Sequence, residues 1–437
     1  MPKKILILNH SLRTDFFKKI KVELERRKKD VFIFYGPSKV DDFSVKNDVI
    51  LLPNPQKLIK KKVNYNFNKK LEELEKNNSK SLNHLLIACE RDLGFHYRSG
   101  NYIFSPTMNY NKLKKEHFIS SLNYCFELVE RVFNKIKPDM IVSGSTNPLY
   151  HAFFFLISKK LKIPIFINRR SKILFNRFYW TQNYNMYNDN IKTFKKKTKV
   201  SEFSKNYIKQ FRNKQVTVSY IKQNWNKHSK FLTVQFKNLV NIGIHNLASI
   251  FYKKHSQLLF FSRVNFFLNL IKNKFTVKPN FVAYSEKELK NLKYLYFPLH
   301  KEPELALNFL APHLSNQLEL IKFLSMSLPI GYKLFIKEHR LNQLRRPRFF
   351  FKKLANFYNV EIISPFDDQF KYIKNAKAVI TNNGTSGWEG ILLDIPVINL
   401  ADSFYDIIAK NKIENISKID IVIQRILFDK KKKTNPK

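Results

Sequence analysis

The chain has 437 residues, of which 44% are hydrophobic, and this apolar content excludes a globally disordered protein. Its length exceeds that of one ordinary hydrophobic core, so we expect two domains. Lysine and arginine outnumber aspartate and glutamate to give a net charge of +45, which favours anionic partners such as nucleic acid, lipid headgroups or acidic sugars. Abundant lysine, asparagine, isoleucine and phenylalanine also share A/T-rich codons, so genome composition is an alternative source of this charge.

The cysteines and the amino-terminal residues bear on the compartment. Only two cysteines occur, Cys89 and Cys125, without a CxxC pair, which indicates neither a disulfide framework nor a zinc site. The apolar run Ile5–Leu8 is shorter than that of a signal peptide and is typical of a first strand. No apolar run approaches the 18 residues of a membrane span. We expect a cytoplasmic protein, either free or attached peripherally to the inner face of the cell membrane.

Strands and helices alternate through the first 170 residues, which predicts a mostly parallel, doubly wound sheet. Apolar runs indicate the strands, and apolar positions with helical spacing, such as Phe16, Phe17, Ile20 and Leu24, indicate the helices. Strands are predicted at 5–8, 31–35, 49–52, after Lys137-Pro138-Asp139 and at 163–168, and helices at 16–24, 71–86, 118–136 and 149–161.

A basic cluster follows the last of these strands and contains Arg169, Arg170 and Arg177. Ligands of doubly wound folds bind beyond the carboxyl ends of the strands, so the cluster is expected to face a ligand cleft. A solvated run of charges is the alternative.

Residues 191–285 mix lysine, asparagine and aromatic residues without the alternation of strands and helices. Patches of helical period predict a basic, aromatic-rich helical connector. Its aromatic side chains would pack on the two domains or, alternatively, contact a membrane surface or polyanion.

The alternation resumes near residue 290 and continues to about 412. Strands are predicted at 294–297, 333–337, 360–363, 378–380 and 395–400, and helices at 316–326, near 354–358 and after the turn at 381–390. Asp367-Asp368 is interpreted as a helix cap. We therefore expect an amino-terminal Rossmann-like domain (1–190), the connector (191–285), a second Rossmann-like domain (286–412), and a carboxyl-terminal helix with a lysine-rich tail (413–437).

The turn Thr381–Gly390 lies between a strand and a helix and contains Gly384, Thr385, Ser386 and Gly387. Backbone N–H groups at a helix start, together with hydroxyl groups, suit an anion such as a nucleotide phosphate. An ordinary helix cap with glycines for tight packing is the alternative. Lys337, His339 and Arg340 end a neighbouring predicted strand and would add positive charge and hydrogen-bond donors.

Three segments carry a family resemblance: Tyr294–Glu304, the triplet Lys337-Glu338-His339, and Asn383–Pro396. In order and spacing they resemble the capsule polysaccharide synthesis proteins, and a weaker likeness extends to Lys137-Pro138-Asp139, Ile163-Pro164 and Ser171–Arg177. Members of that family are GT-B glycosyltransferases with two domains, some of which transfer Kdo from its CMP-activated donor. Arg340 stands where the family usually has proline.

The resemblance implies a nucleotide-sugar donor, CMP-Kdo or an NDP-sugar, as co-substrate and a glycan or glycolipid as acceptor. It makes His300 and Glu304 cleft residues and Glu389 a carboxylate for the ribose hydroxyls. GT-B enzymes need no DxD metal site, and the sequence contains none, so no metal ligands are expected. Phosphate charge would then be neutralised by the helix start, the hydroxyls, His339 and Arg340.

Glycosyl transfer is assisted by a base that takes the acceptor's proton. In GT-B folds this base commonly comes from the amino-terminal domain, and the polar stretch 89–99 offers Asp92 first and Glu90 second. Salt bridges within that stretch are the alternative reading of both carboxylates.

Three functions compete on these observations. The first is a glycosyltransferase of capsular or lipopolysaccharide-type synthesis that extends a lipid-linked or growing glycan. The second is a CDP-linked glycerol- or sugar-phosphate transferase of the same fold. The third is a non-catalytic polyanion- or nucleic-acid-binding protein, against which stand the absence of specific nucleic-acid motifs and the spread of lysine over the whole chain.

Overall fold

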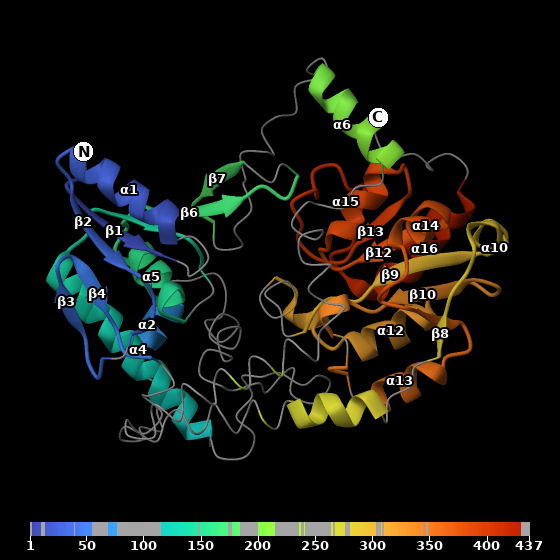
Figure 1. Cartoon of the computed structure of the whole chain (residues 1–437), viewed down its shortest axis with the longest axis horizontal. Coiled ribbons are helices and arrows are strands. Elements are labelled where there is room, and N and C mark those ends of the chain that lie inside the picture. Colours follow the sequence, from blue (N-terminus) through green and yellow to red (C-terminus); the bar gives the residue numbers. More distant parts are fainter. Residues whose placement is uncertain are drawn as a thin grey trace. The chain divides into compact units, whose positions relative to one another are not determined.

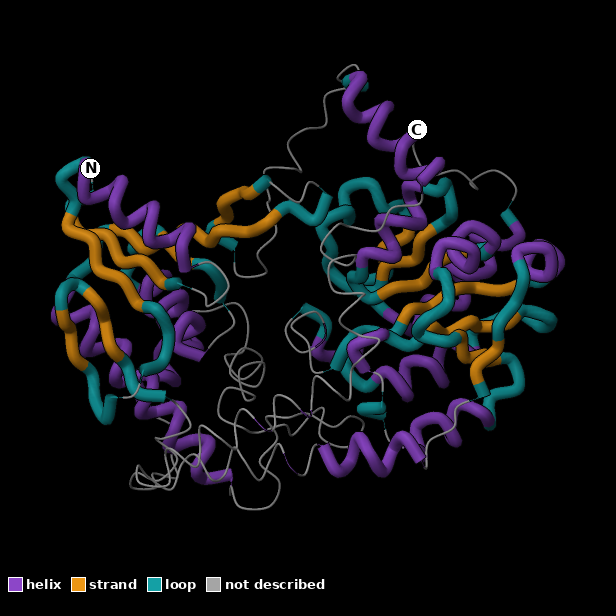
Figure 2. The backbone as a smooth tube through the Cα atoms, viewed as in Figure 1, coloured by secondary structure: helices purple, strands orange, loops and turns teal. Residues whose placement is uncertain are grey.

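The computed structural model forms two compact units, each of which contains a sheet flanked by helices (Figures 1 and 2). Unit 1 contains the described residues up to 183, and unit 2 those from 200 onward. The described residues are 2–9, 14–38, 40–54, 69–76, 115–146, 149–173, 177–183, 200–214, 236, 240, 264, 267–275, 280–302, 307, 310–342, 344–346 and 348–429.

Unit 1 is built on a seven-stranded sheet in the order β3-β4-β2-β1-β5-β6-β7. The five inner strands are parallel, and the two edge strands β3 and β7 are antiparallel to their neighbours. The strands are β1 Lys4–Leu8, β2 Asp30–Phe34, β3 Ser44–Lys46, β4 Val49–Leu51, β5 Met140–Ser143, β6 Ile165–Arg170 and β7 Phe178–Thr181. The helices are α1 Thr14–Arg26, α2 Lys69–Lys76, α4 Lys115–Ile136 and α5 Leu149–Lys160.

Helices cover both faces of this sheet, so its inner strands are apolar on both sides. Ile5, Ile7 and Ile33 belong to the core cluster that contains Phe17 of α1. On the other face the ring of Phe34 lies near the rings of α5, with a centroid distance of 6.1 Å to Phe154. Helix α1 is amphipathic because it lies on one face of the sheet with its other side exposed. Helix α5 is apolar all round because it is buried along nearly its whole length.

Unit 2 is built on a second seven-stranded sheet, β14-β13-β12-β9-β10-β11-β8, in which every pairing is parallel. Its strands are β8 Phe281–Val282, β9 Tyr294–Pro298, β10 Lys333–Lys337, β11 Val360–Ile363, β12 Ala378–Thr381, β13 Val397–Asn399 and β14 Asn411–Lys412. Its α-helices are α6 Glu202–Lys214, α10 Glu286–Asn291, α12 Gln317–Met326, α13 Arg348–Ala355, α14 Gln369–Asn375, α15 Thr385–Leu392 and α16 Ile419–Phe428. Short 3-10 turns span η4 Pro312–Leu314, η5 Arg340–Asn342 and η6 Ile416–Lys418.

Successive residues of the central strands of unit 2 enter opposite cores, as the two-residue period of a strand requires. Leu295 and Phe297 pack with residues of α12, α13 and α16. Tyr294 and Tyr296 pack on the other face with residues of α10 and α14. Ile419 belongs to the first of these clusters, so the carboxyl-terminal helix is part of the unit-2 core.

These two parallel sheets with helices on both faces confirm the predicted fold class of two Rossmann-type α/β domains. The short strands β3, β7, β8 and β14 were not predicted, because segments of two to four residues carry too little periodicity. The predicted helix 71–86 is described only as α2, and most of the predicted connector lies outside the described residues. Within the described ranges, no helix is long and apolar enough to cross a membrane.

Candidate functional site

The candidate site lies at the carboxyl edge of the unit-2 sheet, between β9 and β12. These strands are hydrogen-bonded neighbours. After β9 the chain first forms β10 and β11 on one side of β9, and only later forms β12 on the other side of β9. This is the topological switch point, where open parallel sheets bind their ligands. His300 follows the end of β9, and the turn 382–384 follows the end of β12.

The turn after β12 is held tightly and leads into α15. Gly384 is the N-cap of α15, and its N–H donates to Thr381 Oγ1 at 3.0 Å. The Tyr405 hydroxyl donates to the Gly384 carbonyl at 2.8 Å. Among the described side chains none caps α15, so its first N–H groups remain directed outward from the helix start.

The glycines of this turn are required by close approach. A Cβ added at Gly387 would lie 2.2 Å from Tyr405 Oη, and one at Gly390 would lie 2.9 Å from Val397 Cγ2. A Cβ at Gly384 would lie 3.4 Å from His300 Cε1 and 3.6 Å from its Nε2. The imidazole of His300 therefore lies directly against the backbone that begins α15.

His300 is buried, and its Nε2 has no hydrogen-bond partner within the part of the chain that the structure describes. Burial lowers the pKa of His300 to about 4, so its imidazole is neutral at pH 7. A neutral imidazole keeps one N–H donor and one acceptor nitrogen. The site thus combines a helix start with a neutral ring whose Nε2 is unpaired in the described structure.

A buried polar network fixes the backbone of His300. The His300 N–H donates to Gln317 Oε1 at 2.7 Å, and its carbonyl accepts from Gln317 Nε2 at 3.1 Å and Asn342 Nδ2 at 3.2 Å. Arg346, which is fully buried, lies behind this loop and donates from Nη1 to Glu302 Oε1 at 3.1 Å and from Nε to Glu338. The loops after β9 and β10 are therefore joined through one guanidinium group and two carboxylates.

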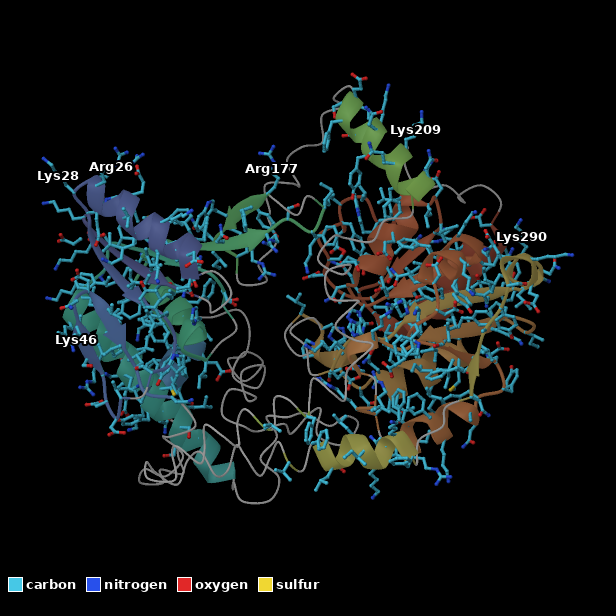
Figure 3. The ribbon with its side chains drawn as sticks, viewed as in Figure 1. Arg26, Lys28, Lys46, Arg177, Lys209 and Lys290 are labelled. Atoms are coloured by element: carbon cyan, nitrogen blue, oxygen red, sulfur yellow. The ribbon has the colours of Figure 1, made fainter. Side chains whose placement is uncertain are left out.

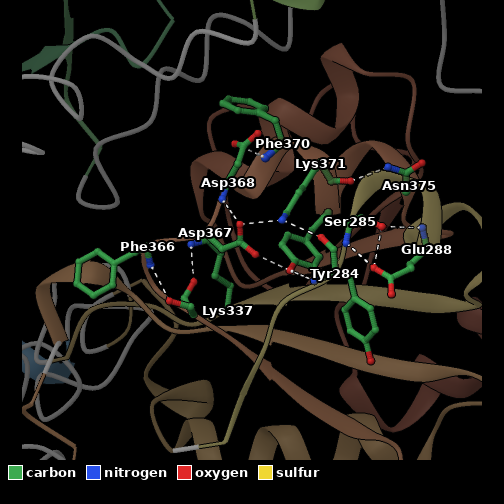
Figure 4. Close-up of polar contacts among 12 residues, drawn as sticks. Tyr284, Ser285, Glu288, Lys337, Phe366, Asp367, Asp368, Phe370, Lys371 and Asn375 are labelled. Atoms are coloured by element: carbon green, nitrogen blue, oxygen red, sulfur yellow. Dashed lines mark hydrogen bonds and ion pairs between the residues drawn. The ribbon is translucent and has the colours of Figure 1, made fainter.

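Lys337 and Arg340 are turned toward a different loop. Lys337 Nζ donates to the carbonyls of Ser364 and Pro365 at 3.1 and 3.0 Å, and Arg340 Nε donates to Pro365 at 2.8 Å. Burial, followed by the charge of Arg340, lowers the pKa of Lys337 to about 7. Both side chains hold the chain after β11. Figure 4 shows Lys337 beside Phe366 and Asp367.

His339 is half-buried, and its backbone N–H donates to Glu338 Oε1 at 2.7 Å. The contact with Gly384 is made by His300 instead. Thr385 is partly exposed and Ser386 is buried, both in the first turn of α15.

Glu389 lies deeper in α15 and is fully buried. Its Oε2 accepts from Gln369 Nε2 at 2.9 Å, whereas its Oε1 has no partner among the described residues. Burial, and secondarily the nearby charge of Asp368, raises the pKa of Glu389 to about 8. The carboxyl is therefore largely protonated at neutral pH.

Asp368 confirms the predicted helix cap, because its Oδ1 accepts from the Phe370 N–H at 3.1 Å at the start of α14 (Figure 4). The adjacent Asp367 accepts from the Tyr372 hydroxyl at 2.6 Å and pairs with Lys371 at 2.8 Å.

Helix α6 comes from the predicted connector and packs on α14 and α15. Phe211 lies 5.8 Å from the Phe370 ring, and Arg212 donates to the Leu392 carbonyl and pairs with Asp394 at 2.7 Å. Trp388 packs against the same cluster. Lys209 lies on the exposed side of the helix (Figure 3). In this helix, an aromatic side chain from the predicted connector packs on unit 2.

The basic cluster of unit 1 lies at the carboxyl end of β6 and the start of β7. Arg177, labelled in Figure 3, and Arg170 are exposed, and Arg169 is half-buried. The Arg170 guanidinium lies 5.7 Å from the Phe178 ring centre. The three arginines lie at the edge of their sheet where β6 ends and β7 begins. The other predicted site residues, Glu90, Asp92 and Glu304, lie outside the described residues.

Sequence reasoning missed Gln317, Asn342, Arg346 and Tyr405. Arg346 occurs in a basic run after a predicted strand, which is the same signal that singled out Arg169 and Arg170. Such runs are usually solvated, so the signal alone does not identify a buried arginine. The role of Gln317 and Tyr405 depends on contacts between distant elements and leaves no local signal. Among the described residues, no group of three or more histidine, cysteine, aspartate or glutamate side chains could hold a metal ion.

No protein-family model and no curated protein matches the chain. Among solved structures, it is similar to a UDP-GlcNAc 2-epimerase of Methanocaldococcus jannaschii in complex with UDP-GlcNAc and UDP, with 16% identity and a TM-score of 0.30 over 99% of this chain and 94% of that one. It is also similar to KpsC, a beta Kdo 2,7 transferase of Thermosulfurimonas dismutans, with 13% identity and a TM-score of 0.30 over 64% of this chain and 70% of that one. These scores are too low to carry an argument about function.

Proposed function

We propose that the chain is a glycosyltransferase that moves a sugar from a nucleotide-activated donor to a lipid-linked or growing glycan of a capsular or lipopolysaccharide-type surface polysaccharide. The observation that carries the proposal is the contact between His300 and Gly384. It combines an uncapped helix start with a buried imidazole whose Nε2 is unpaired in the described structure, at the switch point of a parallel sheet.

A nucleotide phosphate suits the chemistry of this corner. The N–H groups at the start of α15 and the positive end of its dipole stabilise negative charge. A neutral imidazole can donate one further hydrogen bond without the desolvation cost of a buried cation. As the sugar leaves, charge accumulates on the phosphate oxygens, and fixed donors favour that state over the ground state. His300 thereby takes the phosphate-contacting role that the sequence suggested for His339.

The remaining residues of the proposed site act around this phosphate contact. Glu389 is the proposed ribose contact because its Oε1 is unpaired within the described residues. Lys337 and Arg340 would act by holding the loop after β11 and by their positive charge. The arginines Arg169, Arg170 and Arg177 would bind an acidic acceptor at the edge of the unit-1 sheet where β6 ends. Asp92, or alternatively Glu90, is the proposed base that takes the proton of the acceptor hydroxyl.

Titration calorimetry with CMP, CDP, UDP and GDP tests the proposal. We expect one nucleotide to bind in the micromolar to millimolar range. Replacing His300 by alanine removes one hydrogen bond to a charged group, about 1.5–3 kcal/mol, so binding should weaken about tenfold or more. His313→Ala, at an exposed histidine on η4, is the matched control and should bind like the unaltered chain.

A melting curve of His300→Ala separates lost binding from lost folding. The proposal fails if no nucleotide binds the unaltered chain while single- or double-stranded nucleic acid binds with a steep salt dependence. Sugar transfer from a sugar conjugate of the nucleotide that binds, which releases that nucleotide, is then measured with and without EDTA to test the expectation that no metal ion is needed.

A further inference from the structure

Four large apolar side chains are exposed where the unit-2 strands begin, on the edge opposite the candidate site. Their exposed fractions are 97% for Ile330, 89% for Tyr358, 74% for Met326 and 60% for Phe428. We call these four residues the apolar edge patch. Contiguous exposed apolar side chains on a globular protein mark an interaction surface, whereas single ones are ordinary.

Hydrogen bonds and a ring contact bring the four residues together from three chain segments. Ser325, beside Met326 at the end of α12, exchanges two hydrogen bonds with Asn359, at 2.5 and 2.9 Å, and Asn359 follows Tyr358. Ile330 lies in the turn that leads to Tyr332, whose ring lies 6.2 Å from the ring of Phe428. The four residues thus lie at one edge of unit 2, where β10 and β11 start and where α12 and α16 end.

Exposed lysines border the patch. Lys293 and Lys377 immediately precede β9 and β12, and Lys352 and Lys353 lie in the last turn of α13. One exposed acidic residue, Asp429, follows Phe428. Glu361 is the acidic residue nearest the start of β11, and it already pairs with Lys333. The border of the patch therefore carries a surplus of positive charge.

We propose that the apolar edge patch docks on an anionic phospholipid surface, with its side chains entering the headgroup region and the bordering lysines contacting lipid phosphates. A second copy of the chain is the less favourable occupant, because a symmetric contact would place the same lysines of two strongly cationic molecules against each other. A membrane supplies both an apolar phase and opposite charge, and lasting attachment needs both signals together. This inference does not depend on the proposed function.

Vesicle co-sedimentation at 150 mM salt tests the proposal with the full chain. The probes are vesicles of phosphatidylcholine alone and of phosphatidylcholine with phosphatidylglycerol. We expect strong binding only to the second kind, and at least a tenfold loss of partitioning for the triple variant Met326→Ser, Ile330→Ser, Tyr358→Ser. Phe428 is left in place because it packs on Tyr332.

The matched control is the triple variant Val22→Ser, Val200→Ser, Phe203→Ser, whose side chains are 64%, 59% and 61% exposed on other surfaces. It should bind within twofold of the unaltered chain. Equal loss in both triple variants would show that exposed apolar residues elsewhere serve equally well, and no loss in the patch variant would show that the charge of the whole chain attracts it to lipid; either result would overturn the proposal.

Two further measurements separate the alternatives. Lys352→Glu with Lys353→Glu should weaken binding more than Lys18→Glu with Lys19→Glu on α1, although both pairs change the net charge equally. Light scattering of the unaltered chain should show a monomer. A dimer that the patch variant converts to a monomer would identify a self-association surface and overturn the lipid assignment.

Discussion

Replacing Arg346 by methionine should destabilise unit 2 strongly. Its side chain is fully buried between Glu302 and Glu338, which are 3% and 4% exposed. Methionine would fill much of the same space but leave two carboxylates buried without their cation. Removing one partner of a buried ion pair costs about 3–5 kcal/mol. For a domain of this size about 1 kcal/mol shifts the melting temperature by about 2–4 °C, so the unit-2 transition should fall by about 6–20 °C.

Differential scanning calorimetry of the full chain is the appropriate assay, because two units need not unfold in one step. Arg348→Met, at an exposed position on α13, is the control and should change stability by about 0.5 kcal/mol or less. Adding Glu302→Gln and Glu338→Gln to Arg346→Met should restore part of the loss, because the remaining groups are then neutral.

The pH dependence gives a second test of the same variant. Burial already raises the pKa of Glu338 while the Arg346 guanidinium opposes that rise, so removing the guanidinium raises the folded-state pKa of Glu338 further. A raised folded-state pKa means that stability is present at low pH and is lost as pH rises. The deficit of Arg346→Met should therefore shrink on acidification. A melting temperature equal to that of Arg348→Met, or a deficit that grows on acidification, would refute the buried ion network.

Two further predictions concern α15 and are measured by urea unfolding. Gly387→Ala would place a Cβ 2.2 Å from Tyr405 Oη, so we expect a loss of about 1–3 kcal/mol, partly recovered by Tyr405→Phe; an unchanged midpoint would contradict the packing. The folded-state pKa of Glu389 is about 8 against an ordinary value of 4.5, so its stabilising contribution is complete below pH 4.5 and disappears as pH rises through 8. Glu389→Gln should abolish this loss of stability at high pH, so the free energy of unfolding of the variant should exceed that of the unaltered chain by an amount that grows between pH 5 and 9. Parallel pH profiles of the two free energies would count against a raised pKa of Glu389.

Much of the fold follows from local sequence. The apolar runs at β9, β10 and β12 identify core strands because both faces of a parallel sheet are buried, and the strand-turn-helix around Gly384 follows from its glycines and the flanking apolar residues. Asp368 is recognisable as a cap because a cap acts within its own helix turn. The alternation of such elements is enough to predict two doubly wound domains.

The tertiary structure alone decided which side chains meet. Two histidines follow strand ends in unit 2, and only the order of the strands places His300, not His339, against Gly384. Lys337 and Arg340 turn to the loop after β11, and Arg346 joins Glu302 to Glu338, through contacts between segments far apart in the chain. Burial shifts the pKa values of His300 and Glu389, and it too depends on how distant segments of the chain pack together. Strand and helix formation depends on neighbouring residues, whereas the site depends on packing between distant ones.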